Sequence, residues 1–194
     1  VQPMLKPFHK VLVKIVERLV PGDTNAPEFN LLDERFLSSP SVALEQARSA
    51  VISMGEKARE DLRLAVELLA DYDEKKLERL NETEVALDKL EGLLDNYLVK
   101  LTDRALTAEE STRVSELLHT LSDFERIGDY AVNVSESAVV LHDRNITFSP
   151  QARAELERLT AAVGETLDKT VACYQSRQRT LAVQVEPLEE GVDL

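Results

Sequence analysis

The sequence predicts an all-α protein made of long antiparallel helices that pack as a bundle. Of its 194 residues only 6 are glycine and 7 are proline, and helix-favouring leucine, alanine, glutamate and arginine dominate. Apolar positions in residues 77–101 follow the 3-4 spacing of a coiled-coil heptad. No stretch carries the apolar–polar alternation typical of a strand. We therefore expect helices throughout.

The charge of the chain limits its partners. It has 23 lysine and arginine residues against 36 aspartate and glutamate residues, a formal net charge of −13. Such an acidic surface repels phosphate backbones, so we expect no nucleic-acid partner, whereas cations are compatible with it. The single cysteine rules out an intrachain disulfide and a thiolate metal cluster.

Residues 1–20 have the pattern of a basic amphipathic helix. Apolar residues recur at helical spacing, and the polar side carries four cations: Lys6, Lys10, Lys14 and Arg18. Such a helix can lie on an anionic membrane surface or follow a transmembrane span on its cytoplasmic side, and it can equally pack against its own domain. Residues 21–38, which begin with a proline- and glycine-containing stretch, are predicted to be a linker.

The first helical bundle is predicted over residues 39–145. Its first helix starts with Ser39 as a cap and Pro40 in the first helical position, and continues to about residue 71. A short turn at Tyr72 and Asp73 leads to the second helix. The heptad positions of that helix are Leu77, Leu80, Glu84, Leu87, Glu91, Leu94, Leu98 and Leu101.

The third helix begins at a capping box formed by Thr107 and Glu110 and runs to about His142. A fourth helix follows, with Ser149 as the cap and Pro150 in the first position, as at the start of the first helix. This weak internal repeat predicts that residues 146–194 begin a second bundle that is truncated.

Four carboxylates interrupt the apolar stripes of the second and third helices. Glu84 and Asp88 lie one turn apart on the second helix, and Glu125 and Asp129 lie one turn apart on the third. On an ideal helix Glu125 is about 40° from Asp129 and close to the apolar stripe. Because a short connection makes the two helices antiparallel neighbours, we expect the four carboxylates to converge. Hard divalent or trivalent cations would relieve both their burial and their repulsion.

Two simpler interpretations stay open. Arg79, Lys89 and Arg126 could form salt bridges with these acids, or the acids could form a solvated acidic face.

An enzymatic interpretation has little support. Glu116 and His119 form one E-x-x-H motif of the di-iron type, but Glu116 points about 180° away from Glu125 on an ideal helix. We find no phosphate loop, nucleophile elbow or Cys/His cluster, so we predict no catalytic residues and no enzymatic activity.

Three stretches resemble a known family. The run DFERIGDYAVNVSE, residues 123–136, is similar to the signature motif of the PhoU family. Residues 80–101 resemble the middle helix of that family, with its E-x-x-x-D motif. Residues 31–58 resemble the segment that joins the membrane part of bacterial sodium–phosphate cotransporters to their C-terminal PhoU-like domain. Tyr130 replaces the histidine that commonly follows the last aspartate of the motif.

The resemblance implies three-helix bundles with multinuclear metal sites whose metal, such as iron, zinc or magnesium, stays unassigned. It implies three groups of site residues: Glu84, Asp88, Glu125 and Asp129 as metal ligands; Glu91, Asn133 and Asp123 as additional ligands or their supports; Glu189 and Asp193 in an incomplete second site.

The resemblance also implies a role. The chain would be a metal-binding regulatory domain at the cytoplasmic face of the membrane that modulates sodium-dependent phosphate uptake. Its partners would be the transmembrane part of its own transporter chain and a second copy in a homodimer. The alternative is a purely structural helical dimerisation module without metal.

Overall fold

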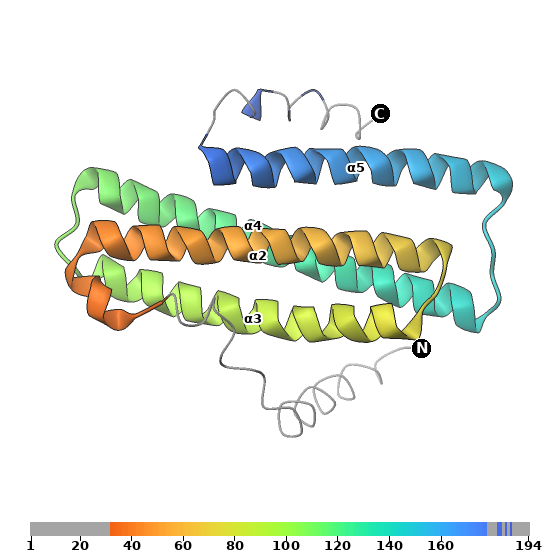
Figure 1. Ribbon diagram of the computed structural model, residues 1–194, viewed down its shortest axis with the longest axis horizontal. Coiled ribbons are helices and arrows are strands. Elements are labelled where there is room, and N and C mark those ends of the chain that lie inside the picture. Colours follow the sequence, from red (N-terminus) through yellow and green to blue (C-terminus); the bar gives the residue numbers. More distant parts are fainter. Residues whose placement is uncertain (1–31, 178–181, 184, 186, 188–194) are drawn as a thin grey trace, which may run out of the picture.

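The computed structural model describes residues 32–177 together with residues 182, 183, 185 and 187. The described elements are a 3-10 helix, η2, and four α-helices (Figure 1), with these bounds: η2 Glu34–Ser38, α2 Pro40–Ala70, α3 Glu74–Thr102, α4 Ala108–Asp143 and α5 Pro150–Ser176. No strand occurs in this part of the chain, so the all-α prediction is confirmed.

The two segments predicted at the N-terminus lie mostly outside the described residues. The basic segment 1–20 lies outside the described residues, and so does the predicted linker up to residue 31. The rest of that linker contains η2, in which Leu37 is buried against the bundle.

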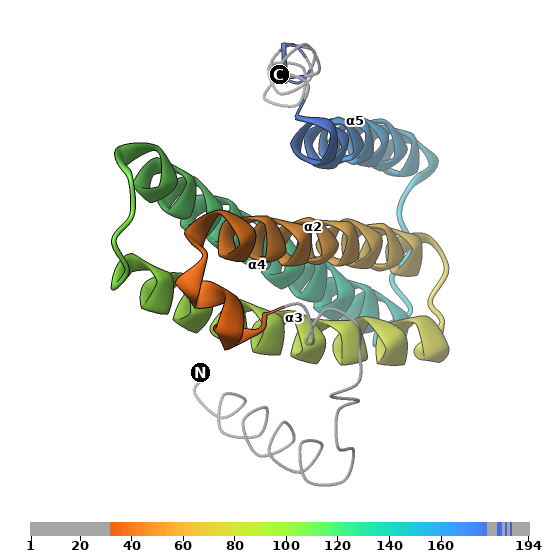
Figure 2. The ribbon, with the colours of Figure 1, turned by 60° about the vertical axis from the view of Figure 1, so that its left-hand side comes forward.

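The helices α2, α3 and α4 form a three-helix bundle. Consecutive helices are antiparallel, so α2 and α4 run in the same direction and cross at a shallow angle (Figures 1 and 2). The fourth long helix, α5, lies along α2 on the side opposite α3 and runs antiparallel to it. Whether α5 begins a second bundle stays a prediction.

Local sequence fixes the start of each helix. Asp73 caps α3 by accepting hydrogen bonds from the backbone N–H groups of Lys75 and Lys76. The predicted capping box of α4 is present, because the Thr107 side chain accepts from the Glu110 backbone and the Glu110 carboxylate accepts from the Thr107 backbone.

The caps of α2 and α5 differ from each other although their sequences are alike. The Ser149 hydroxyl of α5 accepts a hydrogen bond from Ala152 N at 3.1 Å, as predicted. Ser39 occupies the N-cap position of α2, but its side chain makes no capping hydrogen bond with any described residue. Its backbone N–H instead closes the preceding 3-10 turn on Phe36 O, and its ψ of 87° departs from the extended value found at the caps of α3, α4 and α5.

The heptad predicted for α3 captures part of its buried surface. Leu80, Leu87, Leu94, Leu98 and Leu101 are buried, while Leu77, Glu84 and Glu91 are half-buried. The heptad misses Leu90 and Tyr97, which are also buried. The reason is that α3 packs against two helices, α2 and α4, and therefore needs a wider apolar stripe than a two-stranded coiled coil.

The interior of the bundle divides into two clusters along its length. The larger one fills the half near η2 and includes Met54, Leu94 and Phe124. The smaller one fills the other half, and its buried members are Ala65, Leu68, Leu80, Ala131 and Ala138. None of the described helices combines the length and the apolar character needed to cross a bilayer.

Candidate functional site

The predicted metal ligands lie at the edge of the core rather than inside it. Glu84 on α3 and Glu125 on α4 are half-buried, whereas Asp88 and Asp129 are exposed. The sequence placed Glu125 and Asp129 on or beside the apolar stripe of α4, and the structure puts them beside it. The buried stripe of α4 includes Leu117, Leu121, Phe124, Gly128, Ala131, Ser135 and Ala138. Phe124 and Gly128 in this stripe directly precede the acids Glu125 and Asp129.

The acids of α3 and α4 nevertheless act on one another. Burial raises the pKa of Glu125, and the negative charges of Asp129, Glu91 and Asp88 raise it further. Burial likewise raises the pKa of Glu91, followed by the charges of Asp88, Asp95 and Asp129.

Two residues on each helix therefore share one electrostatic neighbourhood. We call these four residues, Asp88, Glu91, Glu125 and Asp129, the acidic face. Glu84, the remaining predicted ligand, is half-buried and lies one turn before Asp88 on α3.

The acidic face fits a cation in its chemistry. All four donors are carboxylates, the ligands preferred by hard divalent ions such as Mg²⁺, Mn²⁺ and Ca²⁺. Their arrangement is open: among the described residues, no three or more His, Cys, Asp or Glu side chains are gathered closely enough to hold a metal ion. Binding would require these flexible side chains to rotate toward one another.

Arg79 and Arg126, two of the cations that could neutralise the acids, have the following contacts. Arg79 forms its ion pair with Glu60 of α2. A side-chain hydrogen bond with Tyr130 raises the pKa of Arg126, and the charges of Asp123 and Glu125 add to this shift. Tyr130, the residue after Asp129, thus interacts with Arg126, which lies one turn before it on α4.

The remaining predicted residues are dispersed. Asp123 and Asn133 are exposed, and Asn133 lines a shallow hollow on α4 together with Glu136 and Val140. Glu189 and Asp193 lie outside the described residues. Glu116 and His119, the residues of the di-iron interpretation, are both exposed on α4.

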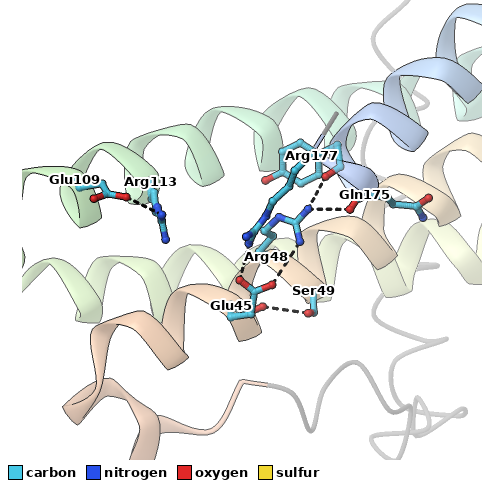
Figure 3. Close-up of polar contacts among 8 residues, drawn as sticks. Glu45, Arg48, Ser49, Glu109, Arg113, Gln175 and Arg177 are labelled. Carbon is cyan, nitrogen blue, oxygen red and sulfur yellow. Dashed lines mark hydrogen bonds and ion pairs between the residues drawn. The ribbon is translucent and has the colours of Figure 1, made fainter. Parts of the chain in front are cut away.

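A second polar site joins α5 to α2, and the sequence did not predict it. The Arg48 guanidinium of α2 donates hydrogen bonds to the backbone oxygens of Tyr174 at 2.6 Å and Gln175 at 3.0 Å, at the end of α5 (Figure 3). Glu45, one turn before Arg48, accepts from Arg177 at 2.6 Å. A cation here satisfies carbonyls that a helix end leaves unpaired and interacts favourably with the helix dipole.

Further along the same junction, Asp168 of α5 pairs with Arg63 at 2.5 Å and with Arg59 at 3.5 Å. Of the side chains described in α5, only Leu167 and Val171 are buried. Ion pairs and hydrogen bonds thus join α5 to α2 alongside the packing of Leu167 and Val171 against the larger cluster. Single helices cannot reveal such pairs, because the partners are more than 100 residues apart in the sequence.

These observations define a class: an all-helical protein with a three-helix bundle that carries an acidic face between its second and third helices. Comparison with known proteins is more specific, because the model of the PhoU domain family matches residues 51–138. This range includes α3, the acidic face and the motif of α4. The chain is therefore PhoU-like over this segment. No solved structure gave a significant match.

The similar proteins are phosphate-transport accessory proteins by name. A "Phosphate-specific transport system accessory protein PhoU homolog" of Xylella fastidiosa is 26% identical over 151 residues, which cover 77% of this chain and 62% of the relative. A PhoU homolog 1 of Methanothermobacter thermautotrophicus is 25% identical, covering 77% and 68%. PhoU of Edwardsiella tarda is 30% identical over 97 residues, covering 50% and 40%. The match thus spans about 62% of the length of the Xylella relative.

Proposed function

We propose that the protein regulates phosphate uptake as a non-catalytic domain that acts on a transporter. The observation that carries this proposal is the match of residues 51–138 to the PhoU domain, which contains the motif Asp123–Glu136 on α4. The relatives named above are accessory proteins of a phosphate-specific transport system. The same proposal places the domain at the cytoplasmic face of the membrane.

The transporter in question is proposed to be a sodium–phosphate cotransporter. This finer proposal is supported by the resemblance of residues 31–58 to the segment that precedes the PhoU-like domain in such transporters. The basic pattern of residues 1–20 is compatible with a position next to the membrane. The partner would then be the transmembrane part of the same chain.

The acidic face is proposed as the regulatory element, with a hard cation as its ligand. Support comes from the raised pKa of Glu91 and of Glu125, because each records unfavourable carboxylate charge that a bound cation would compensate. The bound cation would supply positive charge that holds α3 and α4 together. Its ligands would be Glu84 and Asp88 on α3 and Glu125 and Asp129 on α4, with Glu91 as an additional ligand.

Phosphate uptake in living cells tests this function. In the host cell, the gene would be replaced by one that encodes Glu125→Ala with Asp129→Ala. The control gene would encode Glu109→Ala with Arg113→Ala, which removes an exposed ion pair on the same helix. We expect the acidic-face variant to lose the restriction of labelled phosphate uptake in phosphate-rich medium, and the control to keep it. Unchanged uptake after deletion of the whole gene would overturn the proposal.

One observation supports the alternative of a helical dimerisation module. Leu159 of α5 is 48% exposed, and Leu156 and Val163, one turn away on either side, are half-buried. An apolar stripe of this kind can pair with a second copy. Sedimentation of the wild type and of Leu159→Gln tests this alternative. If the protein is a dimerisation module, the wild type forms a dimer and the substitution weakens that dimer.

A further inference from the structure

A buried carboxyl group lies in the middle of α2. Asp61 is 1% exposed and belongs to the buried stripe of the helix together with Met54, Ala58, Ala65 and Leu68. Its Oδ2 atom is fully covered and has no hydrogen-bond partner among the described residues. A buried unpaired carboxylate oxygen is costly when charged and much less so when protonated.

The charged neighbours of Asp61 do not compensate for its burial. On α2 these are Glu60, which opposes ionisation, and Lys57, which favours it. On α3 Arg79 favours it, but this guanidinium is paired with Glu60. No titratable group of α4 is among those that act on Asp61. Burial therefore dominates and raises the pKa of Asp61 to about 7.

Thr83 of α3 opposes the effect of burial without cancelling it. Its hydroxyl donates a hydrogen bond to the backbone oxygen of Arg79 at 3.0 Å. A hydrogen bond from the Thr83 side chain favours the ionised form of Asp61 and lowers its pKa, but burial is the larger effect. A hydroxyl has one hydrogen, so the Arg79 oxygen and an ionised Asp61 compete for it.

Asp61 also has a defined place in the core. It follows Met54 and Ala58 of the larger cluster and precedes Ala65 and Leu68 of the smaller one. The smaller cluster consists mainly of alanine and leucine side chains, so it has less buried apolar surface with which to resist opening.

We propose that Asp61 is a proton-binding switch at the junction of the two clusters. With the proton bound, the half of the bundle formed by Ala65, Leu68, Leu80 and Ala131 stays closed. When the proton is lost, that half opens more often, and α2 and α3 separate locally within it. This device would make the domain respond to pH independently of any bound cation or phosphate.

The direction of the pH dependence follows from the linkage between proton binding and opening. The folded-state pKa of Asp61, about 7, is above its ordinary value of 3.8. Protonated Asp61 therefore stabilises the closed state fully when the pH is below the ordinary pKa of 3.8, and this stabilisation is lost as the pH rises through about 7. For these two values the opening equilibrium rises roughly tenfold between pH 6 and pH 8 and levels off above that.

Hydrogen exchange of the full chain, corrected for the intrinsic pH dependence of exchange, tests the proposal. Amides of residues 62–69 and 77–83 in the wild type should show the roughly tenfold change in opening between pH 6 and pH 8. Asp61→Asn, which keeps the shape without the charge, should abolish it. The control Glu82→Gln, an exposed acid on α3, should keep it. The same pH dependence in Asp61→Asn would overturn the proposal.

A second measurement does not depend on any variant that might unfold. The carboxyl ¹³C signal of Asp61 in the wild type can be followed by NMR as pH changes. A titration midpoint within about one unit of 7 supports the switch, and a midpoint below about 5 contradicts it.

Discussion

The ring of Phe124 on α4 lies directly against Gly55 on α2. A Cβ atom at position 55 would lie 2.6 Å from Cζ and 2.7 Å from Cε2 of that ring, closer than real side chains approach. The ring is buried and makes an edge contact with Tyr174 of α5, at 6.2 Å between centroids. This contact fixes the spacing of α2 and α4, and Glu125 of the acidic face is the next residue along α4.

Gly55→Ala should therefore destabilise the bundle. The added methyl group forces the buried Phe124 ring to move, at a cost of about 1–3 kcal/mol, which the better helix propensity of alanine offsets by about 1 kcal/mol. We expect a net loss of up to about 2 kcal/mol in denaturant unfolding. Gly92→Ala is the matched control, since nothing lies within 4 Å of its Cβ position. It should gain about 0.5–1 kcal/mol, and a stabilised Gly55→Ala would show that the contact is loose.

Thr107→Ala should remove one half of the capping box of α4. Loss of an N-cap side chain costs about 0.5–2 kcal/mol. Ser39→Ala is the control, because Ser39 holds the equivalent position of α2 without a side-chain capping bond to a described residue. Chemical denaturation of both variants should give a clear loss for Thr107→Ala and a change within about 0.5 kcal/mol for Ser39→Ala. Equal losses would contradict the observed caps.

Arg48→Met should loosen α5. The substitution keeps apolar bulk but leaves the backbone oxygens of Tyr174 and Gln175 without their charged donor, at a cost of about 1–2 kcal/mol. Proteolysis within α5 should accelerate, with cleavage products that retain α2 to α4. Arg113→Met breaks only a surface pair one turn apart on α4, so it should change proteolysis little. Similar cleavage of the two variants would count against an Arg48 clamp.

Glu125→Gln should stabilise the protein at neutral pH and have little effect in acid. The pKa of Glu125 is raised, so the cost of its charge is absent below its ordinary value of 4.5 and appears as pH rises through the folded-state pKa. Repulsion of like charges one turn apart amounts to about 0.2–0.5 kcal/mol. Thermal unfolding at pH 4 and pH 7.5, in buffer with a chelator, checks this. Glu136→Gln, an exposed acid about three turns further along α4, should show no such difference.

Much of the fold could be predicted because it depends on local signals. Pro40, the Thr107 capping box and Ser149 mark helix starts that the structure reproduces. The heptad of α3 identified most of its buried leucines. It missed Leu90 and Tyr97 because a period of 3.5 describes contact with a single partner helix, whereas α3 has two.

The site was harder to predict than the fold. The exact rotation of α4 depends on tertiary packing, in particular on Phe124 against Gly55, so Glu125 and Asp129 lie at the edge of the core rather than within it. Glu84 was grouped with them by motif spacing, and Glu91, whose pKa the charges of Asp88 and Asp129 raise, was placed among the additional ligands. Asp61 left a signal that could have been used: together with Met54, Ala58, Ala65 and Leu68 it follows a 4-3-4-3 spacing.

The most direct test of the account is calorimetric titration of the full chain with Mn²⁺, a hard cation suited to carboxylate ligands. We expect saturable binding to the wild type that is lost in Glu125→Ala with Asp129→Ala and retained in Glu109→Ala with Arg113→Ala. Binding that is equally strong in the acidic-face variant, or no saturable binding to the wild type, would contradict a cation site between α3 and α4.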